Sequence, residues 1–165
     1  MNKILFLLLS LSIMNYAKGQ TTDTQNINTT LDNWHKAAAE ADFDAYFELM
    51  SKDAVFIGTD AAEVWNKTEF MSFSKPYFEQ GKAWDFTSID RNIYFDPTGK
   101  IAWFDELLDT WMQLCRGSGV LKKENGQWKI AHYVLSVTIP NEEIQPVIAL
   151  KREIDSTYIK SLPKQ

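Results

Sequence analysis

The chain has 165 residues, of which 45% are hydrophobic, and carries 17 basic and 22 acidic side chains for a formal net charge of −5. This length fits one domain with its own hydrophobic core. The acidic excess argues against nucleic acid or an anionic membrane surface as a partner, because both would repel the protein.

The first nineteen residues have the pattern of an export signal. Lys3 supplies positive charge, residues 4–14 form an apolar run, and Ala17 and Gly19 place small residues before a cleavage site at Gln20. The apolar run is too short to span a bilayer. We therefore expect a periplasmic or extracellular protein that has no membrane contact once the signal is removed. The alternative is a buried N-terminal helix.

Cysteine and histidine usage limits the possible chemistry. Cys115 is the only cysteine, so an exported form has no internal disulfide and depends on packing for its stability. A buried, inert thiol is expected there, because a nucleophile would need a nearby base and a lowered pKa. His35 and His132, the two histidines, lie far apart in the sequence and give no metal-ligand spacing. We expect neither a metal nor a cofactor.

The mature N-terminal segment predicts two helices. Residues 20–28 are polar and predict a mobile leader. Thr29 or Thr30 can cap the first helix, and Asp42 can cap a second, short helix that runs through Met50. The apolar residues that these helices should bury at helical spacing are Leu31, Trp34, Ala38, Ala41, Phe43, Tyr46, Phe47 and Met50.

The remainder predicts a sheet flanked by helices. Residues 54–59 indicate a buried strand, residues 62–65 a short extended piece and residues 67–80 a helix that stops at Gly81. The apolar spacing then becomes strand-like, and a closing helix follows over residues 142–161. The four expected strands span residues 84–95, 100–112, 114–123 and 127–139. This order of elements predicts an α+β fold with helices on one face of a bent sheet.

A hairpin signal allows the faces of the last two strands to be predicted. Asn125-Gly126 favours a two-residue turn, which places Lys122 opposite Lys129. Two facing lysines repel each other, so that face belongs near water. We expect the other face to be the inner one, and it carries Trp128, Ile130 and His132, with Gly119 opposite His132.

Two adjacent acids interrupt an apolar strand. Asp105 and Glu106 must point to opposite faces, and counting back from the turn at residues 96–99 makes Glu106 the inward one, although a bulge would exchange them. A buried carboxylate needs a hydrogen bond or a charged partner. It would either act as a general base or protonated donor with a raised pKa, or pair with Arg91 or Arg116, or lie near the strand end in water.

Two further polar residues complete the catalytic candidates. His132 could transfer protons near neutral pH or be a hydrogen-bonded core histidine. Asp60 follows a buried strand and could reach a cavity mouth or cap a turn, whereas His35 is expected to face solvent. The candidate set is Glu106, Asp105, His132 and Asp60.

Aromatic side chains are abundant, at 13% of the chain. Their large apolar faces suit the wall of a ligand pocket, and they suit an ordinary core equally well. The residues that we expect to form a pocket wall are Trp34, Tyr46, Trp65, Phe73, Trp103 and Trp128.

Four segments carry a resemblance to a known family: residues 56–65, 102–106, 116–121 and 128–136. Together with the order of elements they resemble the SnoaL-like branch of the nuclear transport factor 2-like superfamily, over residues 27–140. The resemblance implies a cone-shaped, cystatin-like fold, in which a curved antiparallel sheet carries about three helices on its concave face. It also implies a pocket between helices and sheet and, often, a homodimer.

The expected organisation is a signal peptide over residues 1–19, a leader over 20–28, a SnoaL-like domain over 29–140 and a C-terminal helix and tail over 141–165. The superfamily includes isomerases, cyclases, dehydratases and non-catalytic binding modules, so fold alone does not assign a function. We expect the pocket to bind a small, largely apolar or aromatic molecule. The alternatives are a cofactor-independent acid–base enzyme (isomerase, cyclase, dehydratase or hydrolase) and an interaction protein that dimerises through the outer sheet face.

Overall fold

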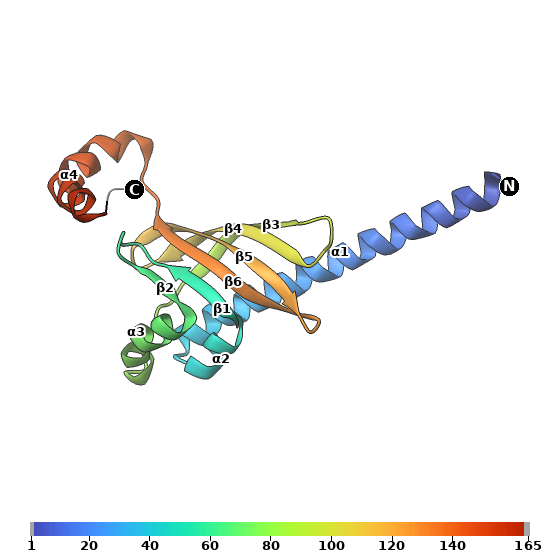
Figure 1. Ribbon diagram of the computed structural model, residues 1–165, viewed down its shortest axis with the longest axis horizontal. Coiled ribbons are helices and arrows are strands. Elements are labelled where there is room, and N and C mark those ends of the chain that lie inside the picture. Colours follow the sequence, from blue (N-terminus) through green and yellow to red (C-terminus); the bar gives the residue numbers. More distant parts are fainter. Residues whose placement is uncertain (1, 164–165) are drawn as a thin grey trace.

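The computed structural model describes residues 2–163, with side chains from residue 21 onward. Figure 1 shows its helices and strands in chain order. They are helices α1 (Asn2–Ala39) and α2 (Phe43–Glu48), strands β1 (Met50–Ile57) and β2 (Val64–Asn66), helix α3 (Lys67–Glu79), strands β3 (Thr87–Phe95), β4 (Ile101–Thr110), β5 (Gln113–Glu124) and β6 (Gln127–Val137), the 3-10 turn η1 (Asn141–Glu143) and helix α4 (Ile144–Ser161).

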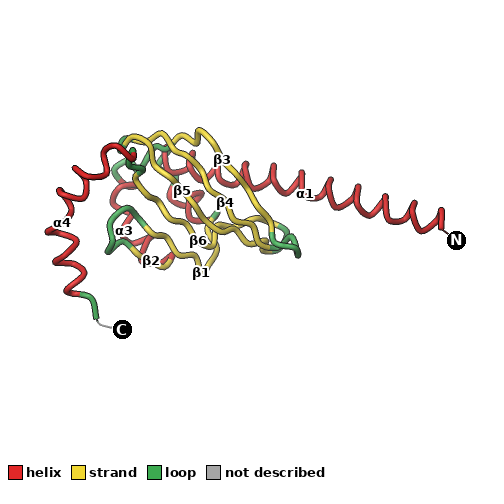
Figure 2. Tube along the Cα trace, turned by 90° about the horizontal axis from the view of Figure 1, so that it is seen from above, coloured by secondary structure: helices red, strands yellow, loops and turns green. Residues whose placement is uncertain are grey.

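The six strands form one curved sheet in the order β2-β1-β6-β5-β4-β3. Strands β3 to β6 are an antiparallel meander, as expected, but β1 pairs with β6 in parallel. The sheet is therefore mixed, since the β1–β6 pair is parallel and the other strand pairs are antiparallel. Helices α1, α2 and α3 cover one face of the sheet (Figures 1 and 2). The expected α+β fold class is confirmed.

Helix α1 begins well before the expected cap at Thr29 or Thr30. Residues 20–28 belong to it, Ile27 is fully buried, and Asp23 accepts hydrogen bonds from Trp128 Nε1 at 3.1 Å and Lys123 Nζ at 2.6 Å. The mobile leader is therefore a wrong prediction, since the apolar stripe begins one turn earlier and Asp23 anchors the preceding turn. Among the described residues no helix has the length and apolar run needed to cross a membrane.

A bulge in β6 changes the predicted inner face. Val120 pairs with His132 but its neighbour Leu121 pairs with Ile130, so β6 gains one residue at this point. The extra residue reverses the alternation beyond it. Tyr133, rather than His132, therefore faces the core, where it is 1% exposed. The prediction of an inward His132 is wrong for this reason.

The pairing of β3 with β4 keeps the predicted faces. Phe95 lies opposite Ala102 and Arg91 opposite Glu106, two residues away from the expected register. A shift of two residues preserves the alternation of faces. Glu106 accordingly lies on the inner face and is fully buried, and Cys115 is fully buried as well.

Helix α4 stands apart from the rest of the fold (Figures 1 and 2). None of its residues is buried, so the prediction that one side of this helix is buried is wrong for the single chain. That expected side comprised Ile144, Val147, Ile148, Ile154 and Tyr158. The chain leaves the sheet through the non-helical residues 138–140, and the one described side-chain hydrogen bond from α4 to the domain is donated by Tyr158 Oη to the Ala61 carbonyl at 3.3 Å.

Candidate functional site

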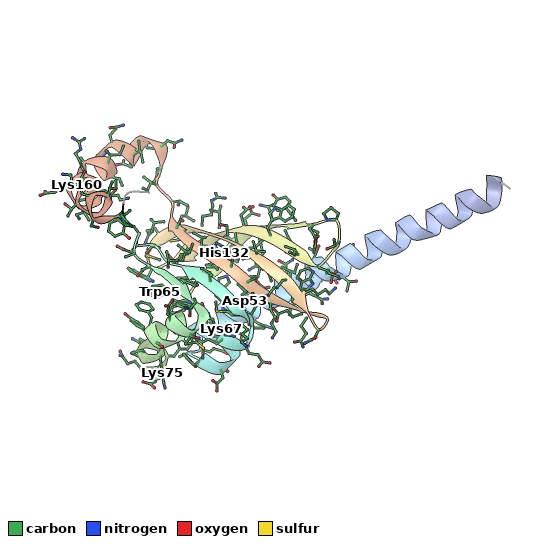
Figure 3. The ribbon with its side chains drawn as sticks, viewed as in Figure 1. Asp53, Trp65, Lys67, Lys75, His132 and Lys160 are labelled. Atoms are coloured by element: carbon green, nitrogen blue, oxygen red, sulfur yellow. The ribbon has the colours of Figure 1, made fainter. Side chains whose placement is uncertain are left out.

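A cavity of about 150 Å³ lies near the end of the domain where α3, the β1–β2 turn and the β4–β5 turn meet. Its wall is mostly aromatic. The lining residues are Phe56, Gly58, Thr59, Glu63, Trp65, Phe70, Phe73, Trp84, Phe86, Trp111, Met112 and Leu135. Trp65, labelled in Figure 3, stacks on Phe73 at 4.4 Å between ring centroids. Phe56 stacks on Phe70 at 4.0 Å, so much of the wall is preorganised.

Two of the six expected wall residues, Trp65 and Phe73, line this cavity. Trp34 and Tyr46 lie deeper in the core, where their rings stack at 4.8 Å. Within the described residues, Trp34 Nε1 and the Tyr46 hydroxyl are buried without a hydrogen bond of normal geometry. Desolvation outweighs the influence of Trp84 beside Tyr46 and raises the pKa of Tyr46 well above its ordinary value.

The other two expected wall residues lie elsewhere. Trp103 is 46% exposed on the outer face of the sheet, stacked on Tyr94 at 6.0 Å. Trp128 is buried near the β5–β6 turn, where it donates to Asp23. The predictions for both rest on aromatic character alone, which does not distinguish a pocket wall from core or surface.

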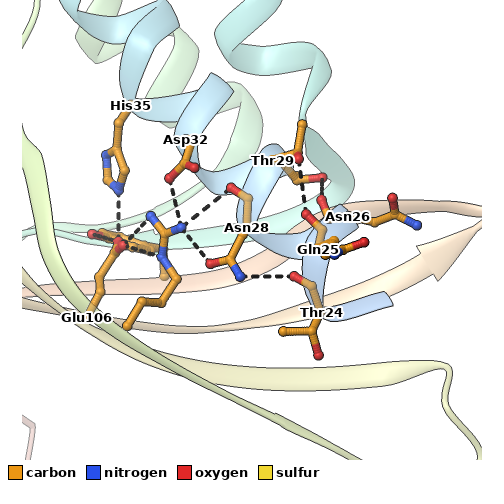
Figure 4. A network of polar contacts seen from close by, with 11 residues as sticks. Thr24, Gln25, Asn26, Asn28, Thr29, Asp32, His35 and Glu106 are labelled. Carbon is orange, nitrogen blue, oxygen red and sulfur yellow. Dashed lines mark hydrogen bonds and ion pairs between the residues drawn. The ribbon is translucent and has the colours of Figure 1, made fainter. Parts of the chain in front are cut away.

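A buried network surrounds Glu106 (Figure 4). Glu106 Oε1 accepts from His35 Nε2 at 2.8 Å and from the Tyr133 hydroxyl at 3.2 Å. Glu106 Oε2 accepts from Arg91 Nε at 2.9 Å and lies 2.8 Å from Arg91 Nη2, which is placed for an ion pair rather than for an aligned hydrogen bond. Arg91 Nη1 continues to Asp32 at 2.8 Å and to the Asn28 side chain at 3.0 Å. The network thereby joins α1, β3, β4 and β6.

The network keeps Glu106 ionised. Burial by itself raises the pKa of a carboxyl, but the hydrogen bond and charge of His35 and the charge of Arg91 together lower the pKa of Glu106 below its ordinary value of 4.5. An ionised carboxylate only accepts hydrogen bonds, so His35 carries a proton on Nε2. Burial and then the Glu106 charge raise the pKa of Tyr133, which remains a donor.

The other catalytic candidates are not part of this network. The Asp105 side chain, 33% exposed on the outer face, lies 3.4 Å from Arg116. Half-buried His132 is on β6 (Figure 3), on the side away from Tyr133. Asp60 is exposed and caps its own turn by accepting from the Ala62 amide at 2.8 Å. Of the four catalytic candidates, only Glu106 belongs to the network.

Sequence reasoning did not identify as site residues the three side chains that contact Glu106. The expectation that His35 faces solvent is wrong, because the residue follows Leu31 by four positions, lies on the apolar stripe of α1 and is 6% exposed. The sequence indicates Arg91 only as a possible ion-pair partner of the acids. Tyr133 was not predicted to face inward, because sequence alone does not reveal the bulge that turns it toward the core.

The geometry makes Glu106 a poor catalytic base. The residue is fully buried, and its two oxygens are held by three side chains.

His35 also lines a shallow hollow of about 300 Å³ together with Asp32, Asp85 and Phe86. Among the described residues no three histidine, cysteine or acidic side chains are grouped as metal ligands.

Another hollow, of about 650 Å³, lies away from both the network and the aromatic cavity. It is a surface groove between α1, α2 and the β5–β6 turn, lined mainly by polar residues such as Asn33, Lys36, Glu40 and Lys129. About half of the exposed lining of this groove is polar, whereas the exposed lining of the aromatic cavity is mostly apolar, as is usual for small-molecule sites. The aromatic cavity is therefore the better candidate site.

The family model for the SnoaL-like domain matches residues 27–140, which is most of the chain. The chain belongs to the SnoaL-like family. The SnoaL-like domain holds both the aromatic cavity and the Glu106 network, and α4 lies beyond it. No curated protein sequence matches the chain.

Solved structures share the fold of this SnoaL-like domain. A nuclear transport factor 2-like protein of unknown function from Pseudomonas putida is 17% identical, with a TM-score of 0.62 over 74% of this chain and 91% of that one. A proposed dehydratase of the same superfamily from Streptomyces avermitilis is 13% identical, with a TM-score of 0.65 over 73% and 99%. A proposed aromatic ring hydroxylase from Novosphingobium aromaticivorans is 14% identical, with a TM-score of 0.63 over 73% and 92%.

Proposed function

We propose that the protein binds a small, largely apolar molecule in the aromatic cavity and releases it unchanged. The observation that carries this proposal is the lining of the cavity, in which aromatic side chains from β1, β2, α3 and the loop before β3 converge. Such concave, mostly apolar sites with a few polar groups are typical of small-molecule binding. Preformed ring stacking lowers the ordering cost of binding.

Calorimetric titration with phenol, a small aromatic probe, tests this proposal. We expect saturable binding to the wild-type protein and at least a tenfold loss in the Met112→Trp variant, whose larger side chain obstructs the cavity. The matched control is Trp103→Phe on the outer face, which should bind phenol as the wild type does. Equal binding to the wild type and Met112→Trp would refute this site.

A cofactor-independent acid–base enzyme is the second candidate, and one observation favours it. His35 lines a surface hollow while its Nε2 is bonded to Glu106, so a substrate in the hollow could meet a histidine–carboxylate pair. This candidate requires a compound to be converted by the wild type and left unconverted by His35→Gln. The proposed dehydratase and the proposed ring hydroxylase among the structural neighbours add no support, because similarity at 13–14% identity shows the fold alone.

Export is a separate proposal that rests on residues 1–19. Cleavage after Gly19 would retain Asp23 and Ile27, the residues that hold this end of α1 on the sheet. In Figure 1 the preceding part of α1 projects beyond the sheet. N-terminal sequencing of protein recovered from the extracytoplasmic fraction should begin at Gln20; an intact Met1 in that fraction would refute cleavage.

A homodimer through the outer sheet face is the proposed assembly. Trp103 and Tyr94 form a stacked pair there and are 46% and 47% exposed, which leaves apolar area for a second copy to cover. Analytical ultracentrifugation should report a dimer that Trp103→Arg converts to a monomer. A wild-type monomer at micromolar concentration would exclude this assembly.

A further inference from the structure

The charge in the aromatic cavity points to a more specific ligand, on the condition that the proposed binding function holds. We propose that the cavity selects a small organic cation, with a quaternary ammonium group placed among the aromatic rings beside Glu63. Glu63 is the only charged side chain in the lining of this cavity as the described residues define it, and no lysine or arginine is present there.

Glu63 is held in position by the β1–β2 turn. Its amide donates to the Asp60 carbonyl at 3.0 Å, its carbonyl accepts from the Gly58 amide at 2.9 Å, and its Oε2 accepts from the Asp60 amide at 3.1 Å. A side chain at residue 58 would collide with Glu63 Oε2, so Gly58 leaves the space that the carboxylate occupies. The negative charge is therefore fixed in the lining of the cavity.

The rings around this carboxylate supply the other half of a cation site. Aromatic faces attract a cation within about 6 Å of the ring centroid, and tryptophan does so most strongly. Trp65, Trp84 and Trp111 all line the cavity. Trp111 is 77% exposed and makes no aromatic pair among the described residues, so its ring is available to a ligand.

The size and field of the cavity agree with this ligand class. A volume of about 150 Å³ lies below the roughly 300–1,000 Å³ of sites for drug-sized ligands, which suits a trimethylammonium group better than a multi-ring molecule. The net charge of −5 also favours the approach of cations over anions. A neutral group of the same shape would gain the apolar contacts but not the attraction to Glu63 and the rings.

Choline and its neutral carbon analogue, 3,3-dimethylbutan-1-ol, separate these contributions. Calorimetric titration of the full chain should show choline binding roughly tenfold more tightly than the analogue. Glu63→Gln should remove most of this preference, because it deletes the charge and keeps a hydrogen-bond acceptor. The matched control is Glu124→Gln in the distant β5–β6 turn, which makes the same change in charge and should preserve the preference.

The outcomes distinguish this inference from the function on which it rests. Equal binding of the two compounds, or binding of phenol without choline, would overturn cation selection and leave the apolar binding function intact. Binding of none of the three would overturn both. Should Glu63→Gln fail to fold, Trp111→Leu decides: it should weaken choline several-fold more than the neutral analogue, and an equal effect on both would overturn the inference.

Discussion

Glu106 and Arg91 illustrate how a charge can be stabilised inside an apolar fold. The carboxylate is fully buried and the arginine side chain is 7% exposed, yet every Glu106 oxygen has a donor. Burial of ions is costly unless partners compensate for the lost water. Because its donors come from three elements, the network fixes the position of α1 against the sheet, and we assign it a positioning role.

Removal of Arg91 should therefore be severe. We predict that Arg91→Leu lowers the free energy of unfolding by about 3–5 kcal/mol, since it leaves Glu106 charged and buried without its cation. The matched control is Arg116→Leu, which breaks the half-exposed pair with Asp105 and should cost less than about 1 kcal/mol. Urea denaturation measures both values, and equal losses would contradict a structural role for the network.

Acid should weaken the same network. The folded pKa of Glu106 lies below its ordinary value of 4.5, so its contribution to stability is fully present above that pH and is lost as the pH falls through the folded pKa. Urea midpoints measured from neutral pH to below 4.5 should fall less steeply in Glu106→Gln than in the wild type. Asp105→Asn, on the outer face, should keep the wild-type slope. A steeper acid loss in Glu106→Gln would contradict this account.

At the scale of elements, the observed strand register differs from the predicted one at two places, with opposite consequences. The β3–β4 pairing differs from expectation by two residues, which keeps Glu106 inward. The bulge in β6 adds one residue, which moves His132 outward and Tyr133 inward. Turn residues predict where a hairpin reverses, but an internal bulge depends on packing against the opposite strand, so sequence alone could not locate it.

The helices show a similar division between local pattern and tertiary contact. Apolar spacing predicts α2, α3 and most of the buried stripe of α1. It does not predict the start of α1, because residues 20–28 are polar except for Ile27, and one apolar residue does not establish a period. This segment is held by the burial of Ile27 and by the bonds from Trp128 and Lys123 to Asp23, which depend on residues about a hundred positions away.

Helix α4 should contribute little to the stability of the domain. None of its residues is buried, and its described side-chain link to the domain is the bond from Tyr158 to Ala61. We predict that ending the chain at residue 143 changes the free energy of unfolding by less than about 1 kcal/mol. The reason is that removal of α4 uncovers little apolar area of the remaining domain. Thermal and urea denaturation of the full and shortened chains measure the difference. A loss of several kcal/mol would mean that α4 packs on the domain in solution.

At the scale of the whole molecule, the fold separates a closed interior from an open aromatic cavity. The Glu106 network fastens α1 to the sheet, while the cavity lies where α3 and the β1–β2 and β4–β5 turns meet. The fold class was predictable because it follows from the order of elements. The cavity wall was not predictable, because Trp65 and Trp103 have the same side chain. Only the side of the sheet on which each lies distinguishes the tryptophan in the cavity from the one on the outer face.

The most direct test of the account is an NMR titration of the tryptophan indole N–H signals with phenol. We predict saturable shifts at Trp65, Trp84 and Trp111, which line the cavity, with the signals of Trp103 and Trp128 unchanged and the phenol recovered intact. Shifts confined to Trp103 or Trp128, or the absence of any saturable shift, would contradict the proposal that this cavity is the binding site.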